Sequence, residues 1–208
     1  DKIYLMGHSW GSFIGIQAAA KAPQLYHAYI GVGQMSNQMA SEKLAYDYML
    51  QRYQELGNTD MVSKLRAAPV TAAPPLPADY LRIRDGAMHS LGVGTTHEMR
   101  AVTWGMSFPS WRCRAHTVAE KVNLWRGKVS ALNEPLKKAY LSTDLTATVT
   151  SLDIPVYFLH GRYDYTVSSS LAKQYLASIS APVKGFYTFD RSAHSPVYEQ
   201  PDQARTIL

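Results

Sequence analysis

A serine between two glycines stands near the start of the chain, in the run Gly7-His8-Ser9-Trp10-Gly11. The apolar run at 2–6 predicts a buried strand, and the composition of 12–22 predicts a helix. A sharp turn from a strand into a helix strains the serine backbone and projects its hydroxyl from the rim of a sheet. Side chains at both flanking glycine positions would collide in that turn, which accounts for glycine there. The run therefore predicts Ser9 as a nucleophile.

The predicted turn also offers a place for negative charge. Ser9 lies at the N-terminus of the predicted helix, where free N–H groups and the helix dipole favour anions. The backbone N–H of Trp10 is therefore expected to face the oxyanion that develops when a serine attacks a carbonyl group. The alternative is a tight glycine turn with an inert serine.

A serine hydroxyl needs a base that removes its proton, and the base needs an acid that orients it. In sheets with such a turn, the acid and then the base follow the nucleophile along the chain, each after the C-terminal end of a strand. Asp164 follows the predicted strand 154–159, and His194 follows the predicted strand 183–189. The order predicts a Ser-His-Asp triad in which Asp164 is the acid and His194 is the base.

Each of these assignments has a plainer alternative. Aspartate often serves as a turn or cap residue, which is the alternative for Asp164, and His194 could be a surface-loop histidine. Asp153 precedes its strand and so lies at the wrong end of the sheet. Asp190 could replace Asp164 as the acid only by reaching back across its own loop. Asp164 therefore stays the favoured acid.

The other histidines predict neither a second base nor a metal site. His160 lies in a strand–turn segment and is expected to pack, while His8 is expected to fix the turn around Ser9. Three further histidines lie in the middle of the chain: His89, His97 and His116. None has metal-ligand spacing to another histidine or to a carboxylate pair. The single Cys113 excludes an internal disulfide and a cysteine-based metal cluster. We expect no metal and no cofactor.

The elements that position these residues divide the chain into three parts. Residues 1–35 are predicted as strand, helix and strand, a unit that implies a parallel sheet. Residues 36–152 are predicted as a helical insertion. Its expected helices span 41–56, 59–68, 78–89, 96–106 and 117–140, the last with an interruption around Pro135. The α/β pattern returns over 153–208 and supplies the acid and the base. The predicted class is α/β, with an inserted helical subdomain.

Composition limits the classes of partner. The chain has 208 residues, 46% of them apolar and 18% charged, as in an ordinary globular protein. Its net charge is +5, but Lys137-Lys138 is the only adjacent basic pair, so no nucleic-acid partner is expected. No apolar run approaches the roughly 20 residues that span a bilayer, so no membrane association is expected. One cysteine favours a reducing compartment, the cytoplasm.

At three places the sequence resembles the α/β-hydrolase superfamily, in particular the proline iminopeptidase-like branch. They are the run around Ser9, the run His160-Gly161-Arg162-Tyr163-Asp164, and the run Ser192-Ala193-His194-Ser195-Pro196 with Glu199 and Pro201 beyond it. The resemblance covers 2–35 and 152–208 well, and the insertion more loosely at 120–127. It implies the same triad, and it implies that the insertion is a cap over the active site.

The resemblance also raises expectations about the cap. In proline iminopeptidases, cap carboxylates grip the free amino group of the substrate. Four glutamates are available for this role: Glu42, Glu98, Glu120 and Glu134. No motif places any of them, and a solvated charge on a helix face is the favoured alternative for each. Three cap tryptophans are expected in the cap core rather than on a pocket wall: Trp104, Trp111 and Trp125.

The resemblance further implies a block of strands before the strand at 2–6, carrying a His-Gly-rich loop with the second oxyanion donor. The chain instead begins at Asp1 and runs at once into apolar residues. We expect it to be the C-terminal part of a longer protein, with the strand at 2–6 as an exposed apolar edge. Either the missing N-terminal segment or a second chain would complete the sheet.

The favoured function is a serine hydrolase that acts on a small ester or amide, with a proline-iminopeptidase-like aminopeptidase preferred among them. One alternative is a non-catalytic relative of these hydrolases that binds a small molecule. Another is one fragment of a split or cleaved hydrolase. Relatives that act on halides or epoxides place an aspartate where this chain has Ser9.

Overall fold

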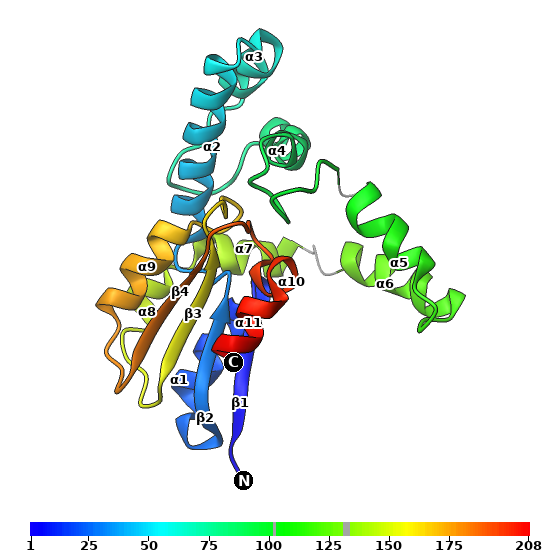
Figure 1. Cartoon of the computed structure of the whole chain (residues 1–208). Helices are drawn as coiled ribbons and strands as arrows, with labels where there is room; N and C mark the ends of the chain where they lie inside the picture. Colours follow the sequence, from blue (N-terminus) through cyan, green and yellow to red (C-terminus); the bar gives the residue numbers. More distant parts are fainter. Residues whose placement is uncertain (102, 131–133) are drawn as a thin grey trace.

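The computed structural model describes residues 1–101, 103–130 and 134–208 (Figure 1). Its sheet has four strands in the order β1-β2-β3-β4, and all neighbouring strands are parallel. The strands are β1 (Ile3–His8), β2 (Tyr26–Val32), β3 (Val156–Gly161) and β4 (Lys184–Phe189). The C-terminal ends of parallel strands meet at one rim of a sheet. The predicted α/β fold with a parallel sheet is therefore confirmed.

Alternating residues of the strands form two apolar layers, one on each face of the sheet. Tyr29 and Phe158 pack with Ile16 of α1 (Trp10–Lys21) and with Tyr175 of α9 (Ser169–Ser178). The residues next to them along the strands point the other way. There Leu159 packs with Ala204 of α11 (Pro201–Ile207), and the short helix α10 (Pro196–Glu199) precedes that helix. A 3-10 turn, η1 (Pro23–Leu25), leads from α1 into β2.

Between β2 and β3 the described chain is mostly helical. Its helices are α2 (Gln38–Glu55), α3 (Thr59–Ala67), α4 (Ala78–Ser90), α5 (Phe108–Arg112), α6 (Val118–Ser130), α7 (Glu134–Ser142) and α8 (Leu145–Thr148), with a π-helix, η2, at Thr103–Ser107. The first three helices form their own apolar core, which contains Met49, Leu65 and Tyr80. Figure 1 shows α5 and α6 projecting away from the rest of the molecule.

The predicted helix at 96–106 is wrong over the described residues 96–101, because local and distant groups engage this backbone. The His97 N–H donates to the Glu199 carboxylate at 2.6 Å, and the Met99 N–H donates to the Thr96 hydroxyl at 3.1 Å. The predicted helix at 117–140 is found as α6 and α7, and its residues 131–133 lie outside the described part. The boundaries predicted at 35 and 152 stay predictions.

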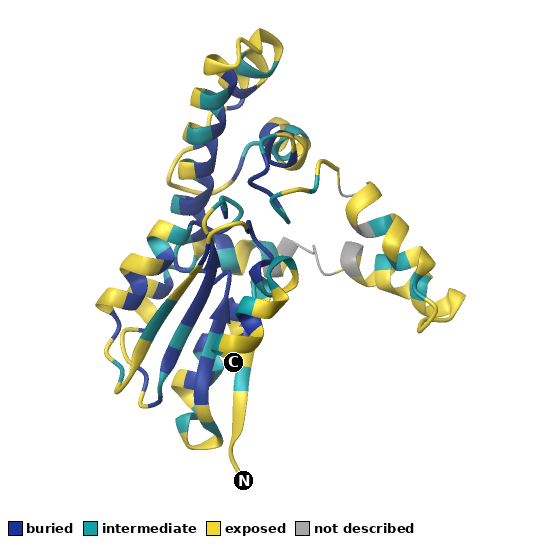
Figure 2. Cartoon of the chain, viewed as in Figure 1, coloured by how far each residue is buried: buried dark blue, intermediate teal, exposed yellow. Residues whose placement is uncertain are grey.

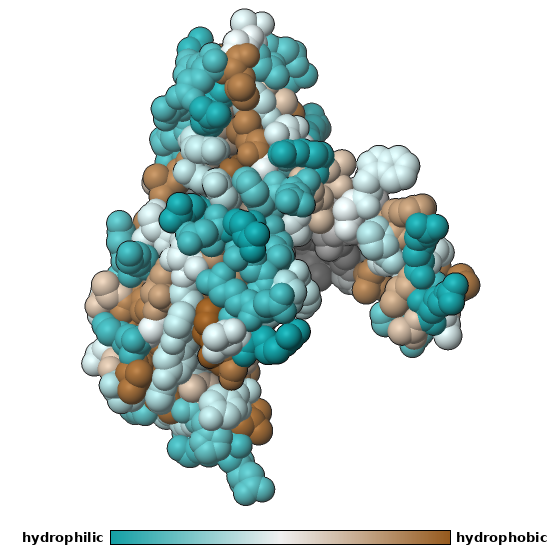
Figure 3. Space-filling model, viewed as in Figure 1, coloured by the Kyte–Doolittle hydropathy of each residue, from teal (hydrophilic) through white to brown (hydrophobic). Residues whose placement is uncertain are grey.

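The edge of the sheet at β1 has no strand partner among the described residues. Ile3 is 60% exposed, Tyr4 69% and Met6 45%, and Figure 2 shows the first half of β1 in the colour of exposed residues. The apolar side chains of Tyr4 and Met6 also line a cavity of about 540 Å³ on the face that carries α11. Figure 3 shows apolar groups, in brown, exposed on the viewed face near the sheet. The expected apolar edge is present.

No helix in the described ranges combines the length and the apolarity that crossing a bilayer requires.

Candidate active site

Ser9 occupies the turn between β1 and α1 in a strained conformation. Its φ is 55° and its ψ is −119°, a region that residues with a side chain rarely adopt. The Ser9 N–H donates to the Val32 carbonyl at 2.9 Å, which ties the turn to the end of the neighbouring strand β2. The hydroxyl of Ser12 bonds the Ser9 carbonyl at 2.5 Å and accepts the Met35 N–H at 3.0 Å. The strain is therefore held in place by contacts on both sides of the turn.

The two glycines around Ser9 differ in how much space there is for a side chain at their positions. A Cβ on Gly7 would overlap the carbonyl of Gly11, so no side chain fits at position 7. A Cβ on Gly11 would meet no described atom within 4 Å. The collision predicted from the sequence is thus present at Gly7, and its prediction at Gly11 is wrong because that Cα faces open space.

The predicted acid and base form a buried pair. Asp164 Oδ2 lies 2.9 Å from His194 Nδ1, and Asp164 Oδ1 accepts the Val167 N–H at 2.9 Å. An ionised carboxylate can only accept, so His194 carries a proton on Nδ1 and leaves Nε2 as a bare acceptor. Within the described chain, His194 Nε2 is buried and has no hydrogen-bond partner. His194 is only 6% exposed, so the alternative that it is a surface-loop histidine is excluded.

The base loop lies beside the turn of Ser9. His8 Nε2 lies 2.8 Å from the His194 carbonyl oxygen, so the imidazole N–H of His8 donates to it. The two rings are 5.0 Å apart, and burial is the main cause that lowers the pKa of His8, followed by the charge of His194. His8 was expected to fix the turn. Its side chain joins that turn to the loop of the base.

Gly33, which directly follows β2, was not identified as a site residue from the sequence. Its φ is +54°, and a Cβ there would lie 2.9 Å from His194 Cε1, 3.0 Å from His194 Nδ1 and 3.5 Å from Asp164 Oδ2. Val32, just before it, accepts the Ser9 N–H at 2.9 Å. Gly33 and Val32 together thus lie against all three residues of the predicted triad. One signal in the sequence could have identified Gly33. It is a glycine directly after a strand whose C-terminal end lies at the same rim of the sheet as the predicted nucleophile.

Trp10 is the first residue of α1, where backbone N–H groups have no partner within the helix. Its indole ring meets Tyr140 edge-on with 6.3 Å between ring centroids, and Trp10 lines the cavity next to Ser9. The predicted oxyanion donor is therefore part of the cavity that holds the predicted nucleophile.

Glu199 joins the base loop to the helical insertion. Its Oε1 accepts the Ala193 N–H at 2.9 Å, and its Oε2 accepts the His97 N–H at 2.6 Å. The His97 ring stacks on Tyr163 at 3.9 Å, and the His194 N–H donates to the Gly94 carbonyl at 3.3 Å. Burial is the main cause that raises the pKa of Glu199. The sequence showed Glu199 only as part of a motif, since its partner in the insertion, His97, lies 102 residues away.

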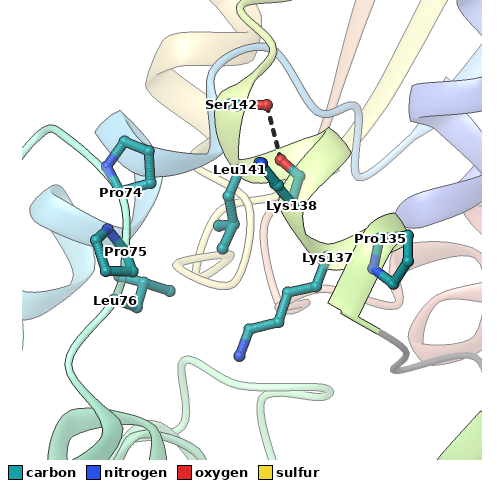
Figure 4. Close-up of a pocket in the computed structure, with 8 residues that line it drawn as sticks. All are labelled: Pro74, Pro75, Leu76, Pro135, Lys137, Lys138, Leu141 and Ser142. Atoms are coloured by element: carbon teal, nitrogen blue, oxygen red, sulfur yellow. Dashed lines mark hydrogen bonds between the residues drawn. The ribbon is translucent and has the colours of Figure 1, made fainter.

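A cavity of about 340 Å³ joins the core to the insertion at Ser9. Its lining includes Ser9, Trp10, Gln38, Glu42, Arg84, Asp85 and Lys137. An adjoining cavity of about 710 Å³ shares Leu76 and Lys137 with it. Figure 4 shows the long side chain of Lys137 extending into this second space, opposite Pro75 and Leu76. The second cavity is otherwise mostly apolar and contains one more lysine, Lys138. Together the cavities offer room for a substrate with an apolar part.

Glu42 is buried, so the solvated-charge alternative is wrong for this residue. Arg84 bonds both carboxylate oxygens, with Nε to Oε2 at 2.7 Å and Nη2 to Oε1 at 2.7 Å. Gln38 Nε2 donates to Oε1 at 3.0 Å, and the Tyr80 hydroxyl donates to Oε2 at 3.0 Å. Four donors thus occupy the acceptor positions of the carboxylate. Burial, and then the charge of Glu42, raises the pKa of Tyr80 well above its ordinary value.

Of the other three cap glutamates, the two whose side chains the structure describes show no place in the site. Glu98 and Glu120 are exposed, and Glu120 accepts the N–H and the hydroxyl of Thr117 at the start of α6. The side chain of Glu134 lies outside the described residues. Trp104 and Trp111 are 73% and 48% exposed, so their prediction as cap core is wrong, because the short elements η2 and α5 that carry them do not bury these side chains. Trp125 is half-buried.

Among the described residues, no group of three His, Cys, Asp or Glu side chains could hold a metal ion. His89 is engaged by Asp85 O at 2.6 Å and by the Thr95 hydroxyl at 3.0 Å.

A strained serine at a strand–helix turn and a buried His–Asp pair lie at the same rim of the parallel sheet. This combination is typical of one fold family, and comparison with known proteins identifies the same family. The family profile described as the alpha/beta hydrolase fold matches residues 1–201. The chain belongs to the α/β-hydrolase fold family.

Similar proteins include one with a curated description and several with solved structures. The chain is 28% identical over 203 residues to "Probable aminopeptidase YbaC" of Bacillus subtilis (strain 168), which covers 97% of this chain and 62% of that protein. The structure resembles that of proline iminopeptidase from Mycobacterium smegmatis, with a TM-score of 0.57, 13% identity, and coverage of 99% of this chain and 63% of that one. It also resembles the esterase EaEST from Exiguobacterium antarcticum, with a TM-score of 0.53, 13% identity, and coverage of 99% and 65%. At these identities the solved structures show a shared fold. The chain spans 62% of the length of the curated relative.

Proposed function

We propose that this chain carries the catalytic triad of a serine hydrolase, with Ser9 as nucleophile, His194 as base and Asp164 as acid. The observation that carries the proposal is the His194–Asp164 pair, which fixes the proton on Nδ1 and leaves Nε2 as an acceptor, in a histidine that contacts His8, the residue before Ser9. In the proposed reaction, Nε2 takes the hydroxyl proton while the Ser9 oxygen attacks the substrate carbonyl carbon. The proton then passes from Nε2 to the leaving group, and water hydrolyses the acyl-enzyme by the same route.

One oxyanion donor in this proposal is the backbone N–H of Trp10 at the start of α1. A second donor, and a strand that pairs with the free edge of β1, are proposed to come from a further segment of the protein or from a second chain. The support for this partner is the exposed apolar edge at Ile3, Tyr4 and Met6. Loss of one oxyanion donor typically costs ~10²–10³ in rate, so we expect the 208-residue chain alone to react slowly.

The proposed substrate is a small ester or amide, with an aminopeptidase substrate favoured. The name of the curated relative supports this preference. The four donors on Glu42 leave it no place for an ammonium group. Asp85 lines the same cavity and bonds Arg84 Nη1 through Oδ1 at 2.9 Å, so its Oδ2 is proposed to accept the amino group. The apolar part of the substrate would enter the adjoining cavity at Leu76. The single cysteine favours a cytoplasmic protein.

A fluorophosphonate probe tests the triad. We expect the probe to label Ser9 in the 208-residue chain, faster when the rest of the protein is present, and to spare Ser9→Ala. The Ser63→Ala variant, which removes an exposed serine hydroxyl on α3 away from the turn, is the matched control. Labelling that persists in Ser9→Ala would overturn the assignment of the nucleophile.

A further inference from the structure

Two imidazoles face the same oxygen of Asp164. His194 Nδ1 lies 2.9 Å from Asp164 Oδ2, and His160 Nδ1 lies 3.7 Å from it. The side chains of Asp164 and His160 are fully buried. The second distance is too long for a hydrogen bond, but it brings a polar atom against a carboxylate from which water is excluded.

The hydrogen bonds of His160 determine where its proton lies. Its Nε2 accepts the backbone N–H of Gln34 at 2.7 Å, so Nε2 cannot carry a proton. A neutral imidazole carries one N–H, which must then be at Nδ1. Burial is the main cause that lowers the pKa of His160 to about 4, so the ring is neutral at neutral pH. Within the described chain this Nδ1 has no hydrogen-bond partner, and its N–H faces Asp164.

The packing prevents the ring from turning away. His160 stacks on Phe186 of the neighbouring strand, with ring centroids 5.6 Å apart and 10° between the planes. Its partner Gln34 is fully buried, and the Gln34 side chain is held by the Tyr29 hydroxyl at 2.7 Å and the Met35 carbonyl at 2.7 Å. The Nδ1–H therefore has one direction available, toward the acid.

We propose that His160 is a positioning residue of the proposed triad: its Nδ1–H dipole faces Asp164 Oδ2 across 3.7 Å in a buried site and steadies the charge of the same oxygen that bonds the base. The proposal rests on the proposed function only in that the role of His194 as base makes this effect matter for rate. A dipole whose positive end points at Oδ2 offsets part of the carboxylate charge, and this weakens the attraction between the carboxylate and the His194 proton. His160 therefore makes His194 easier to deprotonate than Asp164 alone would.

Other groups also face His194 and have to be kept constant. They are the ring of His8 at 5.0 Å and Glu199, which bonds the N–H of Ala193 next to the base. Tyr198 approaches His8, with 6.4 Å between ring centroids. Substitutions at His160 leave all of them in place.

Two matched variants of His160 separate the roles of its two ring nitrogens, Nε2 toward Gln34 and Nδ1 toward Asp164. In His160→Gln, the side-chain oxygen can reach the position of Nε2 and accept the Gln34 N–H, but no donor faces Asp164. In His160→Asn, the amide nitrogen can replace Nδ1 as donor to Asp164, but the Gln34 N–H loses its acceptor. NMR titration of ¹³C,¹⁵N-histidine-labelled 208-residue chain measures the pKa of His194 in each without any substrate.

We expect the pKa of His194 to rise by roughly half a pH unit or more in His160→Gln, and to stay near the wild-type value in His160→Asn. In the wild type, the ¹⁵N shifts should show His160 protonated at Nδ1 and not titrating between pH 5.5 and 9. An unchanged pKa of His194 in His160→Gln, equal shifts in both variants, or a proton on His160 Nε2 would overturn the proposal. If a variant does not fold, the wild-type ¹⁵N shifts decide alone. Failure of the probe to label Ser9 would contradict the proposed function and leave these readouts unaffected.

Discussion

The imidazole of His194 lies directly over the α-carbon of Gly33. A Cβ at Gly33 would stand 2.9 Å from Cε1 and 3.0 Å from Nδ1 of that ring. The residue type at position 33 thus sets the position of the predicted base, although Gly33 has no functional group.

The first prediction concerns this contact. Gly33→Ala should displace the His194 ring and slow fluorophosphonate labelling of Ser9 by about 10²-fold, since a misplacement of about 1 Å can cost that much. It should also cost roughly 1 kcal/mol of stability, because its φ of +54° strains any residue with a Cβ.

Gly57→Ala is the control, because Gly57 has a φ of +68° and open space around its Cα. It should show a similar backbone cost with no change in labelling rate. Equal labelling rates in the two variants would contradict the role given to Gly33.

The second prediction concerns recognition of an amino group. With the complete protein, Asp85→Asn should raise KM for aminoacyl amides about tenfold or more and leave hydrolysis of uncharged aryl esters unchanged, because only the amides carry an ammonium group for Asp85. The exposed Asp79→Asn on the same helix is the control. A loss shared by both substrate types would argue against binding of an amine at Asp85.

The third prediction concerns the buried ion pair of the insertion. Arg84→Leu leaves the Glu42 carboxylate buried and uncompensated, so the free energy of unfolding should fall by about 3–5 kcal/mol. Arg82→Leu removes an exposed pair with Asp79 and should cost less than about 1 kcal/mol. Urea unfolding measures both. Similar small losses would show that the insertion does not depend on the Glu42–Arg84 pair.

The fourth prediction concerns acid stability. The folded state lowers the pKa of His160 from its ordinary value of 6.5 to about 4, so between these values the unfolded chain binds a proton that the folded chain does not. Stability from this residue is complete above pH 6.5 and is lost as the pH falls toward 4, to a total of roughly 3 kcal/mol. His8, whose pKa is also lowered, acts in the same direction.

Urea midpoints at pH 7.5, 5.5 and 4.5 measure this slope. His160→Gln should be less stable than the wild type at pH 7.5 and should lose less stability on acidification. A wild-type slope in the variant would assign the acid sensitivity to other groups.

The fifth prediction concerns the free edge of β1. The exposed apolar residues there should make the 208-residue chain self-associate at micromolar concentration, which sedimentation velocity detects. Tyr4→Lys should reduce this association, whereas Leu56→Lys, at an equally exposed apolar site at the end of α2, should not. A monomeric wild type with a cooperative melt would contradict the view that another strand normally covers this edge.

The sequence predicts well whatever is encoded locally. Short apolar runs rich in β-branched and aromatic residues predicted the strands, and the runs around Ser9, Asp164 and His194 predicted a shared rim, since each follows the end of a strand. What it could not predict depends on partners distant in the chain. The sequence favours Glu42 as a solvated charge on a helix face, because nothing near it in the chain indicates that Arg84, 42 residues away, packs against it. The orientation of His160 depends on Gln34, 126 residues earlier.

Glu199 binds the backbone of the base loop with one carboxylate oxygen and the backbone of the insertion with the other. A change of shape in the insertion near His97 would therefore reach the loop of the proposed base through this side chain, in addition to the backbone bond between His194 and Gly94. Selectivity for a substrate and reactivity toward it are coupled in such an arrangement. A substitution in the insertion that changes which substrate binds would also change the position of the proposed base, and with it the rate of the reaction.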